Sequence, residues 1–383
     1  MKKQKEEESK SWKKKWGYLA TILVGIVLGI TRAIITEKTG RDPIADMGST
    51  NIFIVFISLA VSIFFHIVTH EAGHLIFGLL SGYSFVSFRI GSFTLVHAKN
   101  QWKIRRFHIP GTGGQCLMAP PAMDEEGNYP IKLYNLGGIL VNLVFSLLFT
   151  VLAMVADDPN AKSIFIGAAG MGYIVFLSNG IPMKVGGIAN DGYNVLSIDQ
   201  DPIGKRCFHM QLEVNARLSE GERMKDLPYE LVRVEKNSEL KNPIIASGKL
   251  FEYYWYVDQL KFDEGECVLK EFESVWDQMI PLLRNMIAME RIYLEIIHKN
   301  RQEIIEELMT KEVKTYLKSV KYDVHASRVQ YGLVLREDST REQTMKAKEH
   351  FLKVIQNNPV EGEAIMSLEL ANYMEEQLAK EYS

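Results

Sequence analysis

Four apolar windows of about 20 residues or more dominate the first half of the sequence, at roughly residues 16–35, 51–80, 133–156 and 163–183. A hydrocarbon core about 30 Å thick requires about 20 apolar residues for each helical crossing, because unpaired backbone groups are too costly there. The windows therefore predict four membrane-spanning helices. This pattern excludes a water-soluble protein, a disordered chain and a nucleic-acid binder built on overall basicity.

Lysines gather before the first window, with seven of them in residues 1–15. Positive charge beside a span favours the cytoplasmic side, so we expect the N-terminus inside and the first window to be a retained anchor. Four crossings return the chain to the same side. The sequence thus predicts a multi-pass protein of the cell membrane, of the bacterial cytoplasmic type, with both termini cytosolic. Three cysteines without a pairing pattern agree with a reducing compartment.

An acidic residue, Glu71, interrupts the second window. A charge at membrane depth costs about 2.5 to 3.5 kcal/mol and is by default a functional candidate. It belongs to an H-E-x-x-H motif that runs from His70 to His74. Four-residue spacing puts both imidazoles on one helical face, where they can hold one Zn²⁺ while Glu71 accepts a proton from water. The alternative is that the histidines only pack in a helix bundle, which leaves them without partners in hydrocarbon.

A catalytic zinc site needs a third protein ligand and an open fourth position. The histidine pair lies toward the inner end of the second window, so the third ligand should come from the inner end of another one. The fourth window leads to Asn190-Asp191-Gly192, where Asp191 is the natural carboxylate. A simple Asn-Asp-Gly turn at the membrane surface explains the same residues equally well.

These motifs resemble the site-2 protease group of intramembrane zinc metalloproteases, the M50 peptidases, over roughly residues 50–195. That family combines an H-E-x-x-H helix, a G-x-x-x-N helix and an N-x-x-P segment that leads to D-G. After the histidine motif, the matching residues here are Gly138 and Asn142, then Asn179, Pro182, Asp191 and Gly192. The resemblance implies an intramembrane zinc protease in which Asp191 is the third metal ligand.

Two asparagines of these motifs, Asn142 and Asn179, are candidates for positioning the substrate or a developing oxyanion. For Asn142 the alternative is an interhelical hydrogen bond. The stretch that ends at Asp191 is longer than is usual in the family and has Asn190 where Leu is common. Asp191 could therefore lie farther from the metal, with Asp199 as a fallback ligand.

Three further histidines, His66, His97 and His108, could also bind the metal. A spare histidine more often supports a ligand or packs, and we expect that here. Strands at 85–90, 93–97 and 102–109 predict a small sheet in the inner loop, residues 84–118. Its exposed edge could receive a substrate peptide in extended form, as the resemblance also implies. Alternatively, the strands only cap the bundle and touch anionic lipid headgroups.

From about residue 200 the chain becomes polar, with helical periodicity at 243–260, at 271–297 with a break near Pro281, and at 301–317. Ala347 and Phe351, followed by Pro359, match one tetratricopeptide repeat. We expect a helical cytosolic domain, either tetratricopeptide-like or of another helical type, that recruits a partner protein, restricts access to the site or only stabilises the enzyme.

The sequence thus predicts a mainly α fold with segments 1–50 (cytosolic N-terminus, first anchor and outer loop), 51–199 (three-span core with the inner β loop) and 200–383 (cytosolic helical domain). The predicted function is a zinc endopeptidase that cuts a membrane-embedded or membrane-associated peptide near the cytosolic face, such as a signalling or leader peptide precursor or a membrane-tethered regulator. The rival hypothesis is a catalytically silent metal-binding scaffold whose helical domain binds partner proteins. The expected partners are the substrate and the lipid bilayer, and not nucleic acid; the oligomeric state stays open.

Overall fold

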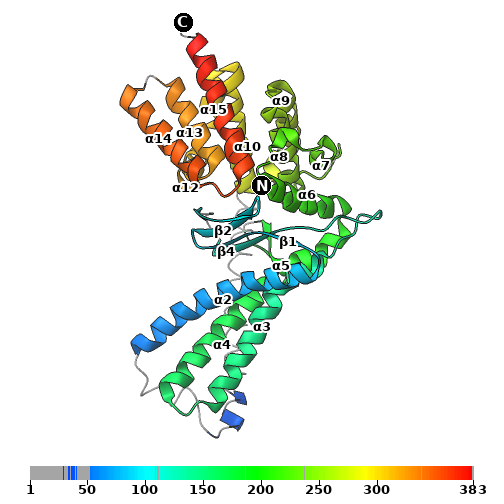
Figure 1. The fold of residues 1–383 in the computed structure, drawn as a ribbon, viewed down its shortest axis with the longest axis vertical. Coiled ribbons are helices and arrows are strands. Elements are labelled where there is room, and N and C mark those ends of the chain that lie inside the picture. Colours follow the sequence, from blue (N-terminus) through cyan, green and yellow to red (C-terminus); the bar gives the residue numbers. More distant parts are fainter. Residues whose placement is uncertain are drawn as a thin grey trace, which may run out of the picture. The chain divides into compact units, whose positions relative to one another are not determined.

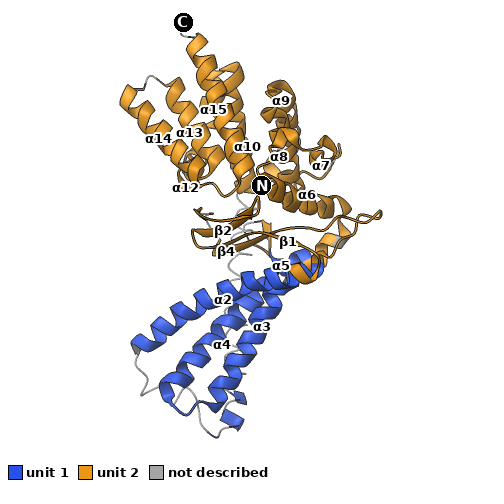
Figure 2. Cartoon of the chain, in the orientation of Figure 1, with its two compact units in different colours: residues 1–77, 132–183, 190–194 blue, residues 78–131, 184–189, 195–383 orange. Residues whose placement is uncertain are grey.

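The computed structural model describes residues 29, 33–34, 36–38, 40, 52–107, 109, 112–185, 187–236, 238–337 and 339–381. The chain divides into two compact units (Figure 2). The first contains residues 1–77, 132–183 and 190–194, and the second contains residues 78–131, 184–189 and 195–383. Most of the first predicted span, residues 16–35, lies outside the described residues. The predicted segment boundaries stay predictions.

Three long helices form the described part of the first unit (Figure 1). They are α2 (Ile52–Leu80), α3 (Ile131–Val155) and α4 (Pro159–Gly180). Among the described residues, these are the helices long and apolar enough to cross a membrane, and they coincide with the second, third and fourth windows. α4 begins after Asp158, whose carboxylate accepts a hydrogen bond of 2.8 Å from the backbone N–H of Ala161.

Polar side chains line one face of α2 at four-residue intervals and are buried. They are Ser58, Ser62, His66, His70 and His74. The opposite pattern holds on the outside of this helix, where Phe53, Phe56 and Phe64 are each more than half exposed. Polar groups inside and apolar groups outside are typical of a helix that faces lipid, because polar groups in hydrocarbon must find partners within the protein.

Small residues allow α2 and α3 to approach closely. A Cβ atom on Gly73 would lie 2.4 Å from the carbonyl oxygen of Gly137, and one on Gly137 would meet Gly73 at the same distance. Backbones this close exclude any side chain at either position. The contact lies beside the histidine pair and fixes the spacing of the two helices there.

The second unit begins with a four-stranded antiparallel sheet in the order β3-β2-β1-β4. Its strands are β1 (Ser84–Ile90), β2 (Phe93–Ala98), β3 (Gln101–Arg106) and β4 (Gly114–Ala119). Lys99 and Asn100 join β2 to β3 with φ angles of 51° and 57°, as a two-residue hairpin turn requires. The sheet has one strand more than the three predicted, because residues 114–119 pair with β1.

A second hairpin follows α4, formed by β5 (Lys184–Val185) and β6 (Ile188–Ala189). Gly187 in its turn has a φ of +92°, a conformation that favours glycine. This hairpin occupies the lengthened stretch that precedes Asp191. It is followed by α5 (Asp191–Ser197), which starts in the first unit.

The rest of the second unit is helical and is built around one apolar core that includes Met210, Tyr253, Ile287 and Val329. Its longer helices are α6 (Pro202–Ser219), α8 (Pro243–Asp258), α9 (Phe262–Lys270), α10 (Pro281–Leu294), α13 (Val324–Arg336), α14 (Arg341–Asn357) and α15 (Glu361–Glu381). Its shorter helical segments are η2 (Ile198–Gln200), η3 (Met224–Asp226), α7 (Tyr229–Val232), η4 (Glu271–Gln278), η5 (Glu295–Lys299), α11 (Gln302–Leu308) and α12 (Lys311–Ser319).

Two of the predicted helices are interrupted. The predicted break near Pro281 is present, because η4 ends at Gln278 and α10 begins at Pro281. The predicted helix at 301–317 is wrong as a single element: it is divided into α11 and α12. Thr310 causes the second start, since its hydroxyl accepts a hydrogen bond of 3.3 Å from the N–H of Val313. The tetratricopeptide match stays a prediction, although Phe351 is buried and stacks on Tyr331.

Candidate metal centre

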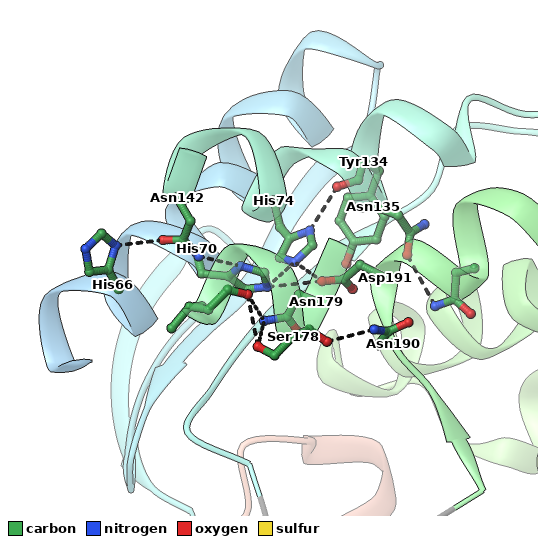
Figure 3. Close-up of polar contacts among 12 residues, drawn as sticks. His66, His70, His74, Tyr134, Asn135, Asn142, Ser178, Asn179, Asn190 and Asp191 are labelled. Atoms are coloured by element: carbon green, nitrogen blue, oxygen red, sulfur yellow. Dashed lines mark hydrogen bonds and ion pairs between the residues drawn. The ribbon is translucent and has the colours of Figure 1, made fainter. Parts of the chain in front are cut away.

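Two imidazoles from α2 and one carboxylate from the start of α5 meet in the first unit (Figure 3). Nε2 of His70 lies 3.1 Å from Nε2 of His74 and 3.1 Å from Oδ2 of Asp191. Nε2 of His74 lies 3.5 Å from the same carboxylate oxygen. The two histidines are buried, and Asp191 is about one-fifth exposed at its side chain.

These three separations fit a tetrahedral zinc ion. Zinc bonds of about 2.0–2.1 Å to nitrogen and oxygen in tetrahedral geometry set the donor atoms roughly 3.3 Å apart. The observed separations of 3.1, 3.1 and 3.5 Å lie close to that value. Two imidazoles and one carboxylate are also the donor set of many catalytic zinc sites, in which the fourth position stays open.

A backbone carbonyl fixes the orientation of His74. Its Nδ1 donates a hydrogen bond of 2.9 Å to the carbonyl oxygen of Tyr134 on α3. The proton therefore resides on Nδ1, and Nε2 presents a lone pair to the other two donors. A metal-binding imidazole commonly has such a partner on its other nitrogen, because the partner sets both the tautomer and the ring orientation.

The amide of Asn142 on α3 lies between His70 and His66. Its Nδ2 is 3.0 Å from Nδ1 of His70, and its Oδ1 is 3.1 Å from Nδ1 of His66. Nε2 of His66 is 3.0 Å from the carbonyl oxygen of Ala168, so His66 faces an oxygen at each nitrogen. Exchanging the positions of Nδ2 and Oδ1 in the Asn142 amide satisfies both imidazoles. Nδ2 then donates to Nδ1 of a neutral His66, and Nδ1–H of His70 donates to Oδ1. Nε2 of His70 then presents a lone pair beside Asp191.

Gly138 makes room for the His70 ring. A Cβ atom at this position would lie 2.5 Å from Cε1 of His70 and 2.6 Å from its Nδ1. Gly172 on α4 has the same relation to His66, whose Cε1 would be 2.4 Å away. In the G-x-x-x-N pattern, Gly138 therefore leaves room for the His70 imidazole. Asn142, one turn later, forms a hydrogen bond with Nδ1 of the same imidazole.

The side chain of Asn190 joins the end of α4 to the start of α5 and so positions Asp191. Its Oδ1 accepts from the N–H of Met183 at 3.1 Å and from that of Tyr193 at 3.0 Å. Its Nδ2 donates to the carbonyl oxygens of Ser178 at 2.8 Å and Ile181 at 2.7 Å. One side chain thus joins the end of α4 to the start of α5. The loop that leaves at Met183 is closed, and its extra length does not move Asp191 away from the histidines.

Gly192 allows that closure. A Cβ atom here would lie 2.2 Å from the carbonyl oxygen of Gly180 and 2.9 Å from that of Asn179. The backbone of α5 therefore starts in direct contact with the end of α4. The Asp-Gly pair works as a unit, in which the glycine permits the approach and the aspartate reaches the histidines.

Burial by itself would raise the pKa of Asp191, but when His70 and His74 are protonated their Nε2–H groups donate to its carboxylate, which outweighs burial and holds that pKa below its usual range. The carboxyl group is therefore ionised, which is the form that binds a metal.

Comparison with protein-family models identifies the family of the chain. The family model described as peptidase family M50 matches residues 58–371, most of the sequence. The chain belongs to peptidase family M50. No curated protein and no solved structure gives a significant match. The resemblance inferred from the motifs is confirmed, and with three apolar helices the family indicates a membrane metalloprotease.

The other candidate residues of this M50 chain lie as follows. Glu71 follows His70 on α2 and is partly buried, with its charge acting on the His74 imidazole. Asn179 donates from Nδ2 to the carbonyl oxygen of Val175 on its own helix at 3.0 Å. His66 lies one turn from His70 on α2 and is not part of the cluster of His70, His74 and Asp191. His97 packs at a tilt against Trp102 in the sheet, with the ring centroids 4.6 Å apart.

The side chain of Asp199 and all of His108 lie outside the described residues. From the sequence, Asn190 was recognised only as a departure from the family pattern, and its structural role was not predicted. The signal was present, because asparagine before a helix start satisfies backbone groups that leucine cannot.

Proposed function

We propose that this M50 protein is a zinc endopeptidase of the cell membrane. Its substrate would be a membrane-embedded or membrane-associated peptide, such as a signalling or leader peptide precursor or a membrane-tethered regulator. The observation that carries this proposal is the convergence of His70, His74 and Asp191 at separations that suit one zinc ion. The lysine-rich N-terminus supports cleavage near the cytosolic face, with both termini cytosolic.

Each residue has a distinct task in this account. Zinc, when bound, would supply a Lewis acid that lowers the pKa of water and polarises a peptide carbonyl. His70, His74 and Asp191 would hold it. Glu71 would accept a proton from the attacking water and deliver it to the departing amine. Asn142 orients His70; the expectation that Asn142 or Asn179 contacts the substrate or the oxyanion remains part of the proposal.

The substrate would enter in extended form along β3. This strand is at the end of the sheet order, with β2 on one side. Phe107 donates its N–H to the carbonyl oxygen of Ser92, so its backbone groups face β2. In an antiparallel pair the backbone groups of successive residues point alternately toward and away from the partner strand. Those of Trp102, Ile104 and Arg106 therefore point away from β2, to the open edge. A peptide strand can pair with those groups, which exposes its own carbonyls as a helix cannot.

The test compares wild type with Glu71→Gln in cells and in proteoliposomes, with the membrane-peptide fragments read by mass spectrometry. We expect fragments from wild type only, and one equivalent of zinc in both proteins, because glutamine keeps the shape of the side chain and removes the base. Identical fragments from both proteins, with zinc retained, would favour the silent scaffold instead. His298→Ala serves as the control, because that histidine lies in the helical part, beside Asp263.

A further inference from the structure

A cavity of about 480 Å³ lies in the second unit, between the end of the sheet and the C-terminal helices. From the sheet it is lined by Arg106 and Phe107, and from the helical part by Tyr322, His350, Lys353 and Asn357. No acidic residue is among those that line it in the described part of the chain. The cavity thus combines aromatic walls with basic groups.

Two of the basic side chains that line this cavity are not neutralised by an acidic neighbour within the described residues. Two lysines on the same helix as Lys353 form ion pairs, Lys346 with Glu342 and Lys348 with Glu375. Neither Arg106 nor Lys353 forms an ion pair within the described residues. The Arg106 guanidinium instead lies 4.1 Å above the ring of Phe93, and Lys353 is exposed at the cavity.

A third cation and a fixed imidazole extend the basic character. Nζ of Lys321 lies 5.0 Å above the ring of Tyr322. Nε2 of His350 lies 2.9 Å from the carbonyl oxygen of Lys321 and donates to it, which holds the imidazole in place beside the cavity. A carboxylate that enters the cavity would therefore meet basic groups from both the sheet and the helices.

The cavity is continuous with the open edge of β3. Arg106 is the last residue of that strand and also lines the cavity. A peptide that pairs with the backbone of Ile104 and Arg106 advances about 3.3 Å per residue. Within a few residues past Arg106 its side chains reach Phe107 and the basic groups beyond it.

We propose that this cavity binds acidic side chains of the extended peptide that pairs with β3, so that the enzyme selects substrates with a carboxylate-rich segment next to the paired strand. The inference rests on the proposed function only in that a peptide strand pairs with β3. An acidic peptide fits better than a lipid headgroup, because Arg106 belongs both to the strand edge and to the cavity and so links the two binding steps.

Binding is measured with Glu71→Gln protein in detergent, so that cleavage does not interfere. The probes are two fluorescein-labelled peptides with a Thr-Val-Thr-Val-Thr strand, one flanked at both ends by Asp-Glu-Asp and the other at both ends by Asn-Gln-Asn, so that either strand direction is tested, and fluorescence anisotropy gives each Kd. We expect the acidic peptide to bind about tenfold more tightly at low salt, which corresponds to two partly exposed ion pairs. The difference should disappear at about 1 M salt, where screening is nearly complete.

Three variants in that background sharpen the test. Lys353→Glu should remove the preference for the acidic peptide and leave the neutral one bound as before. Lys236→Glu makes the same charge change at an exposed position away from the cavity, and it should keep the preference. Ile104→Pro removes one outward N–H from the strand edge and should weaken both peptides equally.

Equal affinity of wild-type cavity protein for both peptides would overturn the proposal, and so would a preference that survives Lys353→Glu. Unchanged binding of both peptides to Ile104→Pro would overturn the strand pairing on which it rests, without bearing on the metal site. Binding of a soluble short-chain phosphatidylglycerol that is lost in Lys353→Glu, with equal peptide affinities, would assign the cavity to lipid and also overturn it. These binding measurements do not depend on cleavage, so a negative result in the Glu71 experiment would not affect them.

Discussion

At Gly138 one methyl group would reach the imidazole of His70. The added Cβ atom would lie 2.5 Å from Cε1 of the ring, too close for a real contact, so the imidazole itself must move in the packed interior. We therefore expect Gly138→Ala to tilt His70 and to lower zinc affinity at least tenfold, measured by competition with a chelator. Gly167→Ala is the matched control, because its nearest neighbour is Cδ2 of Leu59 at 3.3 Å. Equal zinc affinities in the two variants would contradict the role given to Gly138.

Asn142 should influence a bound metal through His70. Its amide is fully buried, and it bonds to the imidazoles of His66 and His70. Removing a hydrogen-bond partner of a metal-binding histidine typically costs about 10- to 100-fold in metal affinity or activity. We expect that loss for Asn142→Leu, which keeps the volume, as read by zinc competition and peptide cleavage. Ser146→Ala, one turn away, should have little effect; zinc affinity at the wild-type level in Asn142→Leu would rule out the orienting role.

At the scale of elements, the stretch between α4 and α5 depends on Asn190. Its side chain makes four hydrogen bonds, to Ser178, Ile181, Met183 and Tyr193. Each is worth about 1 kcal/mol, so Asn190→Leu should let Asp191 drift and weaken zinc binding several-fold or more. Ser178→Ala is the control, because it keeps the carbonyl oxygen that Asn190 uses. Chelator competition that gives identical zinc affinities for both variants would show that the loop closes without Asn190.

The elements also show what sequence patterns can predict. Length and apolarity predicted α2, α3 and α4, and four-residue spacing predicted that His70 and His74 share a face. The approach of Asp191 could not be predicted in that way, because it depends on hydrogen bonds from Asn190 and on contact of Gly192 with Gly180. Such contacts join elements through backbone groups, which leave no periodic signal in the sequence.

Strand pairing decided the fourth strand, and a local cap at Thr310 decided the helix break. Residues 114–119 follow a glycine-rich stretch and become a strand because β1 offers a free edge for pairing. The helical period at 301–317 continues through Thr310, yet a threonine cap begins a new helix there. Local pattern alone does not separate one long helix from two short ones that bury the same face.

For the molecule as a whole, a buried ionic cluster should make the helical part sensitive to pH. Nε2 of His325 lies 2.9 Å from Oε1 of Glu363, and its Nδ1 lies 3.6 Å from Oε1 of Glu290, which also pairs with Arg328. Asp323 acts on the same cluster. Burial alone would lower the pKa of His325, but the two carboxylates outweigh it and raise that pKa above 6.5.

A raised pKa means that the folded state binds the His325 proton more tightly than the unfolded state does. Its contribution to stability is therefore complete below a pH of about 6.5 and is lost as the pH rises through the folded-state pKa. We expect the unfolding midpoint of the helical part, followed by circular dichroism, to fall in wild type as the pH rises above about 6.5. His325→Gln should be less stable at pH 6.5 and should show a flatter profile. Parallel profiles for the two proteins would assign the pH dependence to other groups.

His70, His74 and Asp191 are expected to hold one zinc ion among the apolar helices of this M50 protein. Zinc content by mass spectrometry, combined with X-ray absorption at the zinc edge, tests it most directly. We predict one equivalent of zinc in wild type and Glu71→Gln, with two imidazoles and a carboxylate at about 2.0–2.2 Å, and loss of that zinc in Asp191→Ala. Absence of zinc from the wild-type protein, or an identical zinc spectrum in Asp191→Ala, would contradict the account.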